Sequence, residues 1–370
     1  TIKYNASGVK QWHAIFNGSY NWYDDAVGIK VDISGNVYIG GLTSVEYRSK
    51  FLVLKYNSSG LFQWSSTYGG SAFDYDNLND FDIDFQGNSY LTGSVVNIGS
   101  LADYGTVKFN SAGQRLWYKT YNGNGNYFDG AASLVVDGSG NVIVTGTASY
   151  DAAGSDRNIV TIKYNSGGDQ LWLKSYHNYS EGGRKVLLDS LGNVYVAGNL
   201  YNSDGKSDYL CLKYNSAGTN IWAKTFSSPG NFNDDIVGMD VTREGYAYLT
   251  GISYNGVEAN SDYLTICFEP LGSVIWQNSY NSPANLRDWP TAIDAGTGGQ
   301  LYVTGYSYDN TEKRIITTLK FSTLIGINPL NSEVPLKYEL KQNYPNPFNP
   351  STKISFSLPH SSITGIEVFD

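Results

Sequence analysis

Residues 137–172 read DGSGNVIVTGTASYDAAGSDRNIVTIKYNSGGDQLW, and versions of this stretch recur along the whole chain. Its closing tryptophan has counterparts at regular intervals: Trp12, Trp64, Trp117, Trp172, Trp222 and Trp276. The glycine that closes GNVIVTG has its own series: Gly41, Gly93, Gly146, Gly198, Gly251 and Gly305. Both markers share one period of about 53 residues, and a fixed period of this length indicates a solenoid or a propeller.

Each repeat reads as four short strands, which we call A, B, C and D. In the repeat from Asp24 to Tyr68, hydrophobic and polar residues alternate over 25–32, 36–42, 51–57 and 61–68. The A–B turn recurs as DISGN and the C–D turn as KYNSSG, in which Asp or Asn accepts backbone N–H groups and Gly supplies a positive φ. Four antiparallel strands per repeat predict an all-β fold, a β-propeller of six blades from this chain.

The order of the strands suggests how the ring closes. The chain begins with a C strand at 2–5 and a D strand at 11–17, and its last set ends with a C strand at 315–321. We expect strand 11–17 to pair with strand 315–321, so that both termini close a six-bladed ring and no sheet edge is left open. One C strand is then surplus, and further blades upstream remain an alternative. The chain also starts without Met inside a repeat, so we expect sequence before Thr1.

Two recurring elements carry a family resemblance. They are the GNVYVTG-like element (35–41, 140–146 and 192–198) and TIKYNSGGDQLW at 161–172. Residues 1 to about 322 resemble the seven-bladed β-propeller repeat (SBBP) proteins, and the resemblance implies four-stranded blades. The sixth repeat departs from the pattern, because TICFEPLGSVIW has Cys267 where lysine usually stands.

The repeats end before a tail of different composition. Residues 323–335 read as a linker, and residues 336–370 contain the segment NYPNPFNPST followed by an expected strand at 353–358. The core of this motif is Asn343, Tyr344, Pro345, Asn346, Pro347, Phe348, Asn349 and Pro350. It resembles the start of the type A C-terminal sorting domain of the type IX secretion system in Bacteroidetes-like bacteria. The resemblance implies contact with that machinery and a protein secreted, or held on the outer-membrane surface, by a Gram-negative cell; a plain proline-rich linker is the alternative.

Composition excludes several classes of protein. The 370 residues include 31 Tyr and carry a net charge of −9. An acidic chain is unsuited to nucleic acid, whose phosphates need a basic surface. No apolar run is long enough to cross a membrane. Cys211 and Cys267 fall in equivalent strands, where we expect small buried residues and no disulfide.

The variable loops indicate the functional face. The A–B and C–D turns are short and nearly identical among repeats, whereas the B–C and D–A loops vary in length and are rich in Tyr, Asn, Asp and Gly. Both kinds of loop lie on the same face of a propeller. Variable loops on a rigid scaffold are where binding residues concentrate, so we expect the binding site on this loop face.

An acidic position recurs on the loop face, eleven residues before the A–B turn glycine. Its members are Asp24, Asp76, Asp129, Glu181, Asp234 and Asp288. They are expected to ring the mouth of the central channel. The favoured interpretation is that each carboxylate accepts backbone N–H groups of the D–A loop. The alternative is a negative mouth that attracts a cation or a basic ligand.

Aromatic residues accompany the acids. They are Trp22, Tyr23, Tyr75, Tyr127, Phe128, Phe232 and Trp289. Exposed, they would suit contacts to protein or glycan; the alternative is that they pack between blades.

No catalytic, metal or cofactor site is predicted. His13, His177 and His360 fall at unrelated repeat positions, so no histidine-based triad or metal site is indicated. We therefore predict a binding or structural module for protein or polysaccharide. The alternative is an extracellular polysaccharide-active enzyme, a hydrolase or lyase, that uses acids at the channel mouth. An asymmetric cluster in a deep pocket would favour the enzyme, and a shallow pseudo-symmetric mouth would favour binding.

Overall fold

The computed structural model describes residues 1–46, 48–71, 76–98, 101–177, 180–254, 256, 260–296, 299–322, 339–340 and 356–357. The chain forms two compact units, Thr1–Ser322 and Thr323–Asp370. Among its described residues, all regular elements of the first unit are strands. Its architecture follows from the repeats.

The strands of the first unit occupy the four predicted positions of each blade. The A strands are β3 (Asp24–Val31), β7 (Asn77–Ile83), β11 (Gly130–Val136), β15 (Ser180–Leu188), β19 (Asp234–Val241) and β23 (Trp289–Gly296). The B strands are β4 (Val37–Val45), β8 (Ser89–Val96), β12 (Val142–Ser149), β16 (Val194–Tyr201), β20 (Ala247–Tyr254) and β24 (Gln300–Tyr308). The C strands are β5 (Arg48–Tyr56), β9 (Ala102–Phe109), β13 (Arg157–Tyr164), β17 (Ser207–Tyr214), β21 (Ser261–Phe268) and β25 (Arg314–Ser322). The D strands are β6 (Phe62–Tyr68), β10 (Arg115–Tyr121), β14 (Gln170–Tyr176), β18 (Asn220–Phe226) and β22 (Val274–Tyr280). Two further strands, β1 (Ile2–Tyr4) and β2 (Lys10–His13), come before the first A strand.

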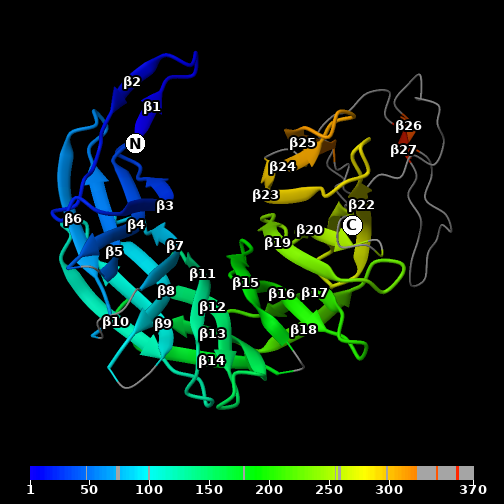
Figure 1. Cartoon of the computed structure of the whole chain (residues 1–370), viewed down its shortest axis with the longest axis horizontal. Helices are drawn as coiled ribbons and strands as arrows, with labels where there is room; N and C mark the ends of the chain where they lie inside the picture. The colour runs from blue at the N-terminus through cyan, green and yellow to red at the C-terminus, as the bar shows by residue number, and fades with distance from the viewer. Residues whose placement is uncertain are drawn as a thin grey trace. The chain divides into compact units, whose positions relative to one another are not determined.

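Pairing between these strands produces propeller blades. The described residues form five four-stranded antiparallel sheets, each with its strands in the order A–B–C–D, and a three-stranded sheet of β23, β24 and β25 (Figure 1). The A strands of successive sheets lie next to one another at the inner edge. The all-β propeller fold is therefore confirmed. The predicted strand positions agree with the observed ones to within a few residues.

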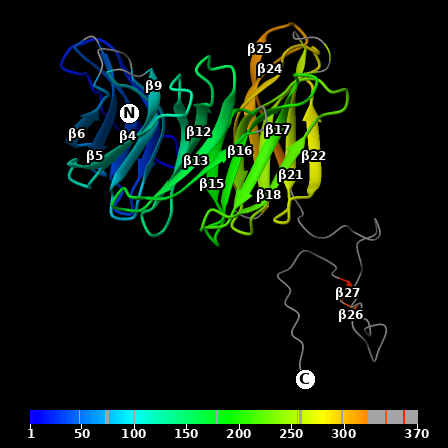
Figure 2. The same ribbon diagram turned by 90° about the horizontal axis from the view of Figure 1, so that it is seen from below.

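The core lies between consecutive blades, whose faces pack against each other (Figure 2). The central B and C strands are almost wholly buried, as in β4 and β17. Between β15–β18 and β19–β22, for example, Tyr209 of one blade and Met239 and Leu249 of the next share one apolar cluster. Burial of both faces explains why these strands read as nearly continuous apolar runs.

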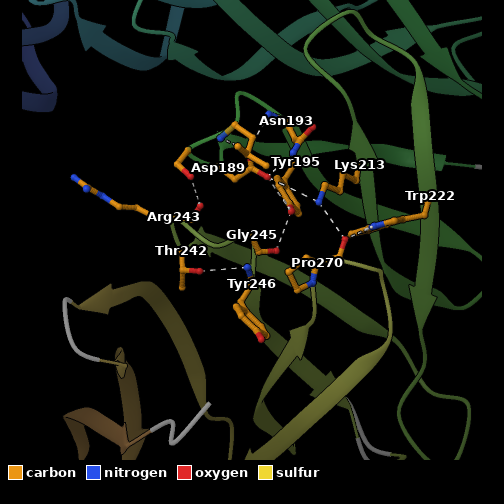
Figure 3. A network of polar contacts seen from close by, with 12 residues as sticks. Asp189, Asn193, Tyr195, Lys213, Trp222, Thr242, Arg243, Gly245, Tyr246 and Pro270 are labelled. Atoms are coloured by element: carbon orange, nitrogen blue, oxygen red, sulfur yellow. Dashed lines mark hydrogen bonds and ion pairs between the residues drawn. The ribbon is translucent and has the colours of Figure 1, made fainter. Parts of the chain in front are cut away.

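Polar contacts on the turn face lock each blade to the next (Figure 3). Lys213 Nζ and Trp222 Nε1 both donate to the carbonyl oxygen of Pro270, at 3.1 Å each. The hydroxyl of Tyr195 donates to the carbonyl oxygen of Gly245 at 2.8 Å. The same indole bond recurs from Trp12 to Ser58, Trp64 to Ser111, Trp117 to Ser166 and Trp172 to Ser216. The repeated Lys, Tyr and Trp thus hold neighbouring blades together.

The predicted closure of the ring is wrong. Strand β2 pairs with β1, and among the described residues β25 pairs only with β24. The physical reason is the blade lock itself. Trp12 donates to the carbonyl of Ser58 at 3.2 Å, and Trp12, Ala14 and Phe16 pack on the apolar face of β4 and β5. Residues 10–16 are therefore already held against the first complete blade.

The second unit is described only at two short strands. They are β26 (Glu339–Leu340) and β27 (Phe356–Ser357), which pair antiparallel. Strand β27 falls within the predicted strand 353–358, whereas the motif residues 343–350 and the linker 323–335 lie outside the described part.

Two smaller findings concern the whole described chain. The thiols of Cys211 and Cys267 are free and buried, as expected for small core residues. Among the residues that the structure describes, no helix is long and apolar enough to cross a membrane.

Candidate functional site

Five of the six predicted ring acids lie at or just before the start of an A strand. They are Asp24, Asp76, Asp129, Asp234 and Asp288; Glu181 belongs to β15, but its side chain lies outside the described part. Apart from the half-buried Asp24, these carboxyl groups are buried. The structure thus places them beneath the loop face, at its inner edge.

The five carboxylates hold the D–A loops in place. Each accepts the backbone N–H of the residue six positions earlier, namely Gly18, Gly70, Gly123, Ser228 and Ser282. The oxygen Asp76 Oδ1 also accepts from the N–H of Val96 at 2.9 Å, and Asp129 Oδ1 from that of Ser149 at 2.6 Å. The predicted hydrogen-bonding role is confirmed for these five acids. The alternative, attraction of a cation or basic ligand, stays a prediction.

Burial changes the ionisation of three ring acids. It raises the pKa of Asp129, Asp234 and Asp288, although the backbone N–H bonds act in the opposite direction. A nearby carboxylate, Asp103 or Asp208, raises the pKa of the first two further. Burial thus makes protonation of these three acids easier than protonation of a free carboxyl group.

Two of the seven predicted aromatic residues meet one ring acid in a cavity of about 630 Å³. Trp22 and Tyr23, from the loop before β3, line it together with Asp76 and Asn77 from the start of the next blade. The B–C residues Ser44 and Ser49 complete its polar wall, and Leu42 adds an apolar one. Trp22 is 61 % exposed and Tyr23 54 % exposed, so their rings face solvent at the cavity. This cavity, which we call the aromatic cavity, combines flat apolar faces with hydrogen-bonding groups.

The remaining aromatic residues divide between packing and exposure. Phe128 is 55 % exposed and meets the half-buried Tyr127 edge-on, with ring centroids 5.0 Å apart. Trp289 is half-buried and lies parallel to Tyr306. Phe232 is half-buried, and Tyr75 lies outside the described part. Packing therefore accounts for some of these residues, whereas Trp22, Tyr23 and Phe128 are each more than half exposed.

A second cavity contains a residue that the sequence reasoning set aside. His177, Tyr150, Asn158 and Tyr121 line a space of about 440 Å³. The ring nitrogen His177 Nδ1 lies 2.6 Å from Asn158 Oδ1 and 3.6 Å from the carboxylate of Asp156. The imidazole also lies against the Tyr150 ring, with centroids 4.8 Å apart. This grouping occurs in one blade only, and such a break in the repeat is the signal that could have identified it.

Comparisons with known proteins place the chain near no characterised family by sequence. No family model matches it, and no curated protein matches it. Among solved structures it is similar to an ulvan lyase of a new polysaccharide lyase family, PL25, bound to a GlcA(1-4)Rha3S saccharide. The sequence identity is 12 %, the match covers 78 % of this chain and 77 % of that chain, and the TM-score is 0.44. It is also similar to a protein of unknown function from Dyadobacter fermentans, with 8 % identity, coverage of 80 % and 93 %, and a TM-score of 0.45. The propeller assignment stands on the repeated sheets themselves.

Proposed function

We propose that this protein is a secreted or surface-attached module that binds polysaccharide through its loop face. The aromatic cavity is the observation that carries the proposal. Exposed Trp and Tyr rings offer flat apolar faces on which a sugar ring can stack, and Ser, Asn and Asp side chains offer partners for its hydroxyl groups. Membership of the SBBP proteins is part of the same proposal.

The arrangement of the cavity supports a binding role. Trp22 and Tyr23 belong to one blade and Asp76 and Asn77 to the next, so a bound chain would contact two blades at once. The carboxylate of Asp76 is already bonded to the N–H groups of Gly70 and Val96. Asp76 therefore fixes the shape of the cavity, while the aromatic rings supply most of the contact area.

A polysaccharide-active enzyme is the second candidate, and the cavity around His177 favours it. An imidazole that lies beside a carboxylate and against a tyrosine ring has the residue types that serve in general acid–base catalysis. Incubation of the purified protein with the polysaccharides that it binds tests this candidate. New reducing ends from the wild type, and none from His177→Gln, would show catalysis.

Export through the tail completes the proposal. The motif at 343–350 resembles a type IX sorting signal, so the secretion machinery is the proposed partner of residues 336–370. An outer-membrane or extracellular location would bring the loop face into contact with polysaccharides.

A glycan array followed by affinity electrophoresis tests the binding proposal. We expect Trp22→Ala and Tyr23→Ala each to weaken binding to the best array hit by at least about tenfold, measured as retardation in a gel that contains it. The estimate takes aromatic stacking on nucleobases, on the order of 1–3 kcal/mol per ring, as the analogy. Phe85→Ala is the matched control, because Phe85 is 76 % exposed in the A–B turn, on the turn face. Equal losses in all three variants, or no array hit, would contradict the proposal.

A further inference from the structure

Three departures from the repeat meet in the cavity that contains His177. Tyr150 follows β12, Asn158 belongs to β13 and His177 follows β14, so all three come from the third complete blade. They lie at the loop-face ends of these strands. We call the space that they line the histidine cavity.

None of these three residue types occurs at the same repeat position in another blade. The counterparts of Tyr150 are Val45, Asn97, Asn202, Asn255 and Asp309. The counterparts of Asn158 are Lys50, Asp103, Asp208, Asp262 and Ile315. The counterparts of His177 are Asn17, Gly69, Asn122, Ser227 and Asn281. Three breaks of the pattern that converge on one cavity indicate a role that the other blades do not share.

Two of these positions form a structural contact in the neighbouring blades. Asn97 Nδ2 donates to the carboxylate of Asp103 at 3.4 Å in the second complete blade. In the fourth complete blade Asn202 Nδ2 donates to that of Asp208 at 3.3 Å. In the third complete blade Tyr150 places an aromatic ring where its neighbours have this amide. A contact within the blade has thus been exchanged for a ring at the cavity.

The imidazole of His177 is held in a defined orientation. Its Nδ1 lies 2.6 Å from Asn158 Oδ1, and because an amide oxygen only accepts, Nδ1 carries the hydrogen. In the neutral imidazole Nε2 is then the acceptor. Asn158 is buried, so the bond fixes the imidazole to the wall of the cavity.

The same imidazole supports the ring of Tyr150. The two rings lie 4.8 Å apart, with 32° between their planes, and Tyr150 is 49 % exposed. The histidine cavity therefore presents a flat apolar ring beside a fixed hydrogen-bonding group. A sugar unit, which has an apolar face and a rim of hydroxyl groups, matches this pair of features.

The histidine cavity and the aromatic cavity both reach the second complete blade. The aromatic cavity includes Asp76 and Asn77, at the start of the A strand of this blade. The histidine cavity includes Tyr121, at the end of its D strand. The loop that follows Tyr121 contains Phe128, which is 55 % exposed. Two binding surfaces on the loop face are thus connected through one sheet.

We propose that the histidine cavity is a second sugar-binding subsite, and that one polysaccharide chain occupies it together with the aromatic cavity. This inference rests on the proposed polysaccharide-binding function and specifies its ligand as an extended chain that crosses blades. A chain that reaches both cavities binds more tightly than a fragment that fills one, because its second contact is intramolecular.

Affinity electrophoresis of the full chain tests the inference with four polymers: xylan, laminarin, dextran and polygalacturonate. Oligosaccharides of two to ten sugar units, prepared from the polymer that retards the protein most, are then added as inhibitors. For the wild type we expect inhibition to strengthen at least about tenfold from the shortest to the longest oligosaccharide.

Variants that restore the repeat test the subsite itself. Tyr150→Asn introduces the residue type of Asn97 and Asn202, so the blade should still fold, which thermal melting checks. We expect Tyr150→Asn to weaken polymer binding about tenfold, with stacking on nucleobases as the analogy, and to abolish the dependence on chain length. We expect His177→Asn to weaken binding as well, because Tyr150 loses the ring against which it lies. Tyr4→Asn is the matched control, because Tyr4 is 56 % exposed and lines neither cavity.

The outcomes separate this inference from the proposed function. Binding that requires Trp22 but is unchanged by Tyr150→Asn and His177→Asn would leave polysaccharide binding intact and overturn the second subsite. Equal weakening by Tyr4→Asn would show a non-specific effect and overturn it too. Absence of binding to all four polymers and to the glycan array would contradict both.

Discussion

The indole N–H of Trp222 donates to the carbonyl oxygen of Pro270 in the following blade, at 3.1 Å. This bond is one of a series of five in the described residues: the tryptophans at 12, 64, 117, 172 and 222 each donate to the next C–D turn. The stability of each blade therefore depends mainly on its contacts with the neighbouring blades. In other repeat architectures, too, the total stability is close to a sum of the stabilities of single repeats and of the interfaces between them.

Removing that bond should weaken one interface measurably. Trp222→Phe retains an aromatic ring but has no donor, so we expect it to lower the free energy of unfolding by about 1 kcal/mol or more, measured by urea denaturation. Trp22→Phe, which alters an exposed ring, is the control and should change little. Equal effects of the two substitutions would contradict the role of the lock.

The ring acids should behave as structural hydrogen-bond acceptors. Asp129 accepts two backbone N–H groups, of which Asp129→Asn can still satisfy one and Asp129→Ala neither. We expect Asp129→Ala to cost about 1–3 kcal/mol more than Asp129→Asn. Thermal melts of both variants should be the same with calcium and with a chelator. A chelator-induced fall in the melting temperature of the wild type would favour the cation-binding alternative.

Two aspartates should give opposite pH dependences. Burial, reinforced by Asp208, raises the pKa of Asp234. Its stabilising contribution is therefore present below the unfolded pKa and is lost as pH rises through the folded value. Burial alone would raise the pKa of Asp137 too, but hydrogen bonds from Asn141 and Lys163 lower it overall. The stabilising contribution of Asp137 is therefore present above its unfolded pKa and is lost as pH falls through the folded value.

Unfolding free energies measured from acid to neutral pH check this contrast. The difference between wild type and Asp234→Asn should fall as pH rises, and the difference between wild type and Asp137→Asn should rise. Differences that change in the same direction would show that the assigned environments are wrong.

Local signals made the blade predictable from the sequence. The A–B turn illustrates this: Asp32 Oδ1 accepts the N–H groups of Ser34 and Asn36, and Gly35 has a φ of 78°, as the DISGN pattern implied. The same local pattern repeats in most blades, so the strands between the turns follow. The five described ring acids were predictable for the same reason.

Closure and the asymmetric sites were not predictable from the repeat. The partner of Trp12 is a carbonyl 46 residues away, and no local pattern reveals which blade it joins. At the repeat positions of His177 and Tyr150 the other blades have different residue types, so periodicity identifies these two residues only as exceptions. Their proximity to other polar groups depends on packing between blades.

The tail should act in export and not in folding. Deletion of residues 326–370 in a native host should leave a folded propeller that accumulates in the periplasm, since the first compact unit ends at Ser322. Cell fractionation with immunodetection measures this. Normal amounts of the truncated protein at the surface or in the medium would contradict the sorting role.

Radical footprinting with mass spectrometry, with and without the polysaccharide selected on the array, tests the central claim most directly. Trp22 and Tyr23 on the loop face, and Phe85 on the turn face, are all exposed enough to be oxidised in the free protein. The account predicts that bound polysaccharide slows oxidation of Trp22 and Tyr23 severalfold and leaves Phe85 unchanged. Protection of Phe85 with no protection of Trp22 or Tyr23 would contradict binding at the loop face.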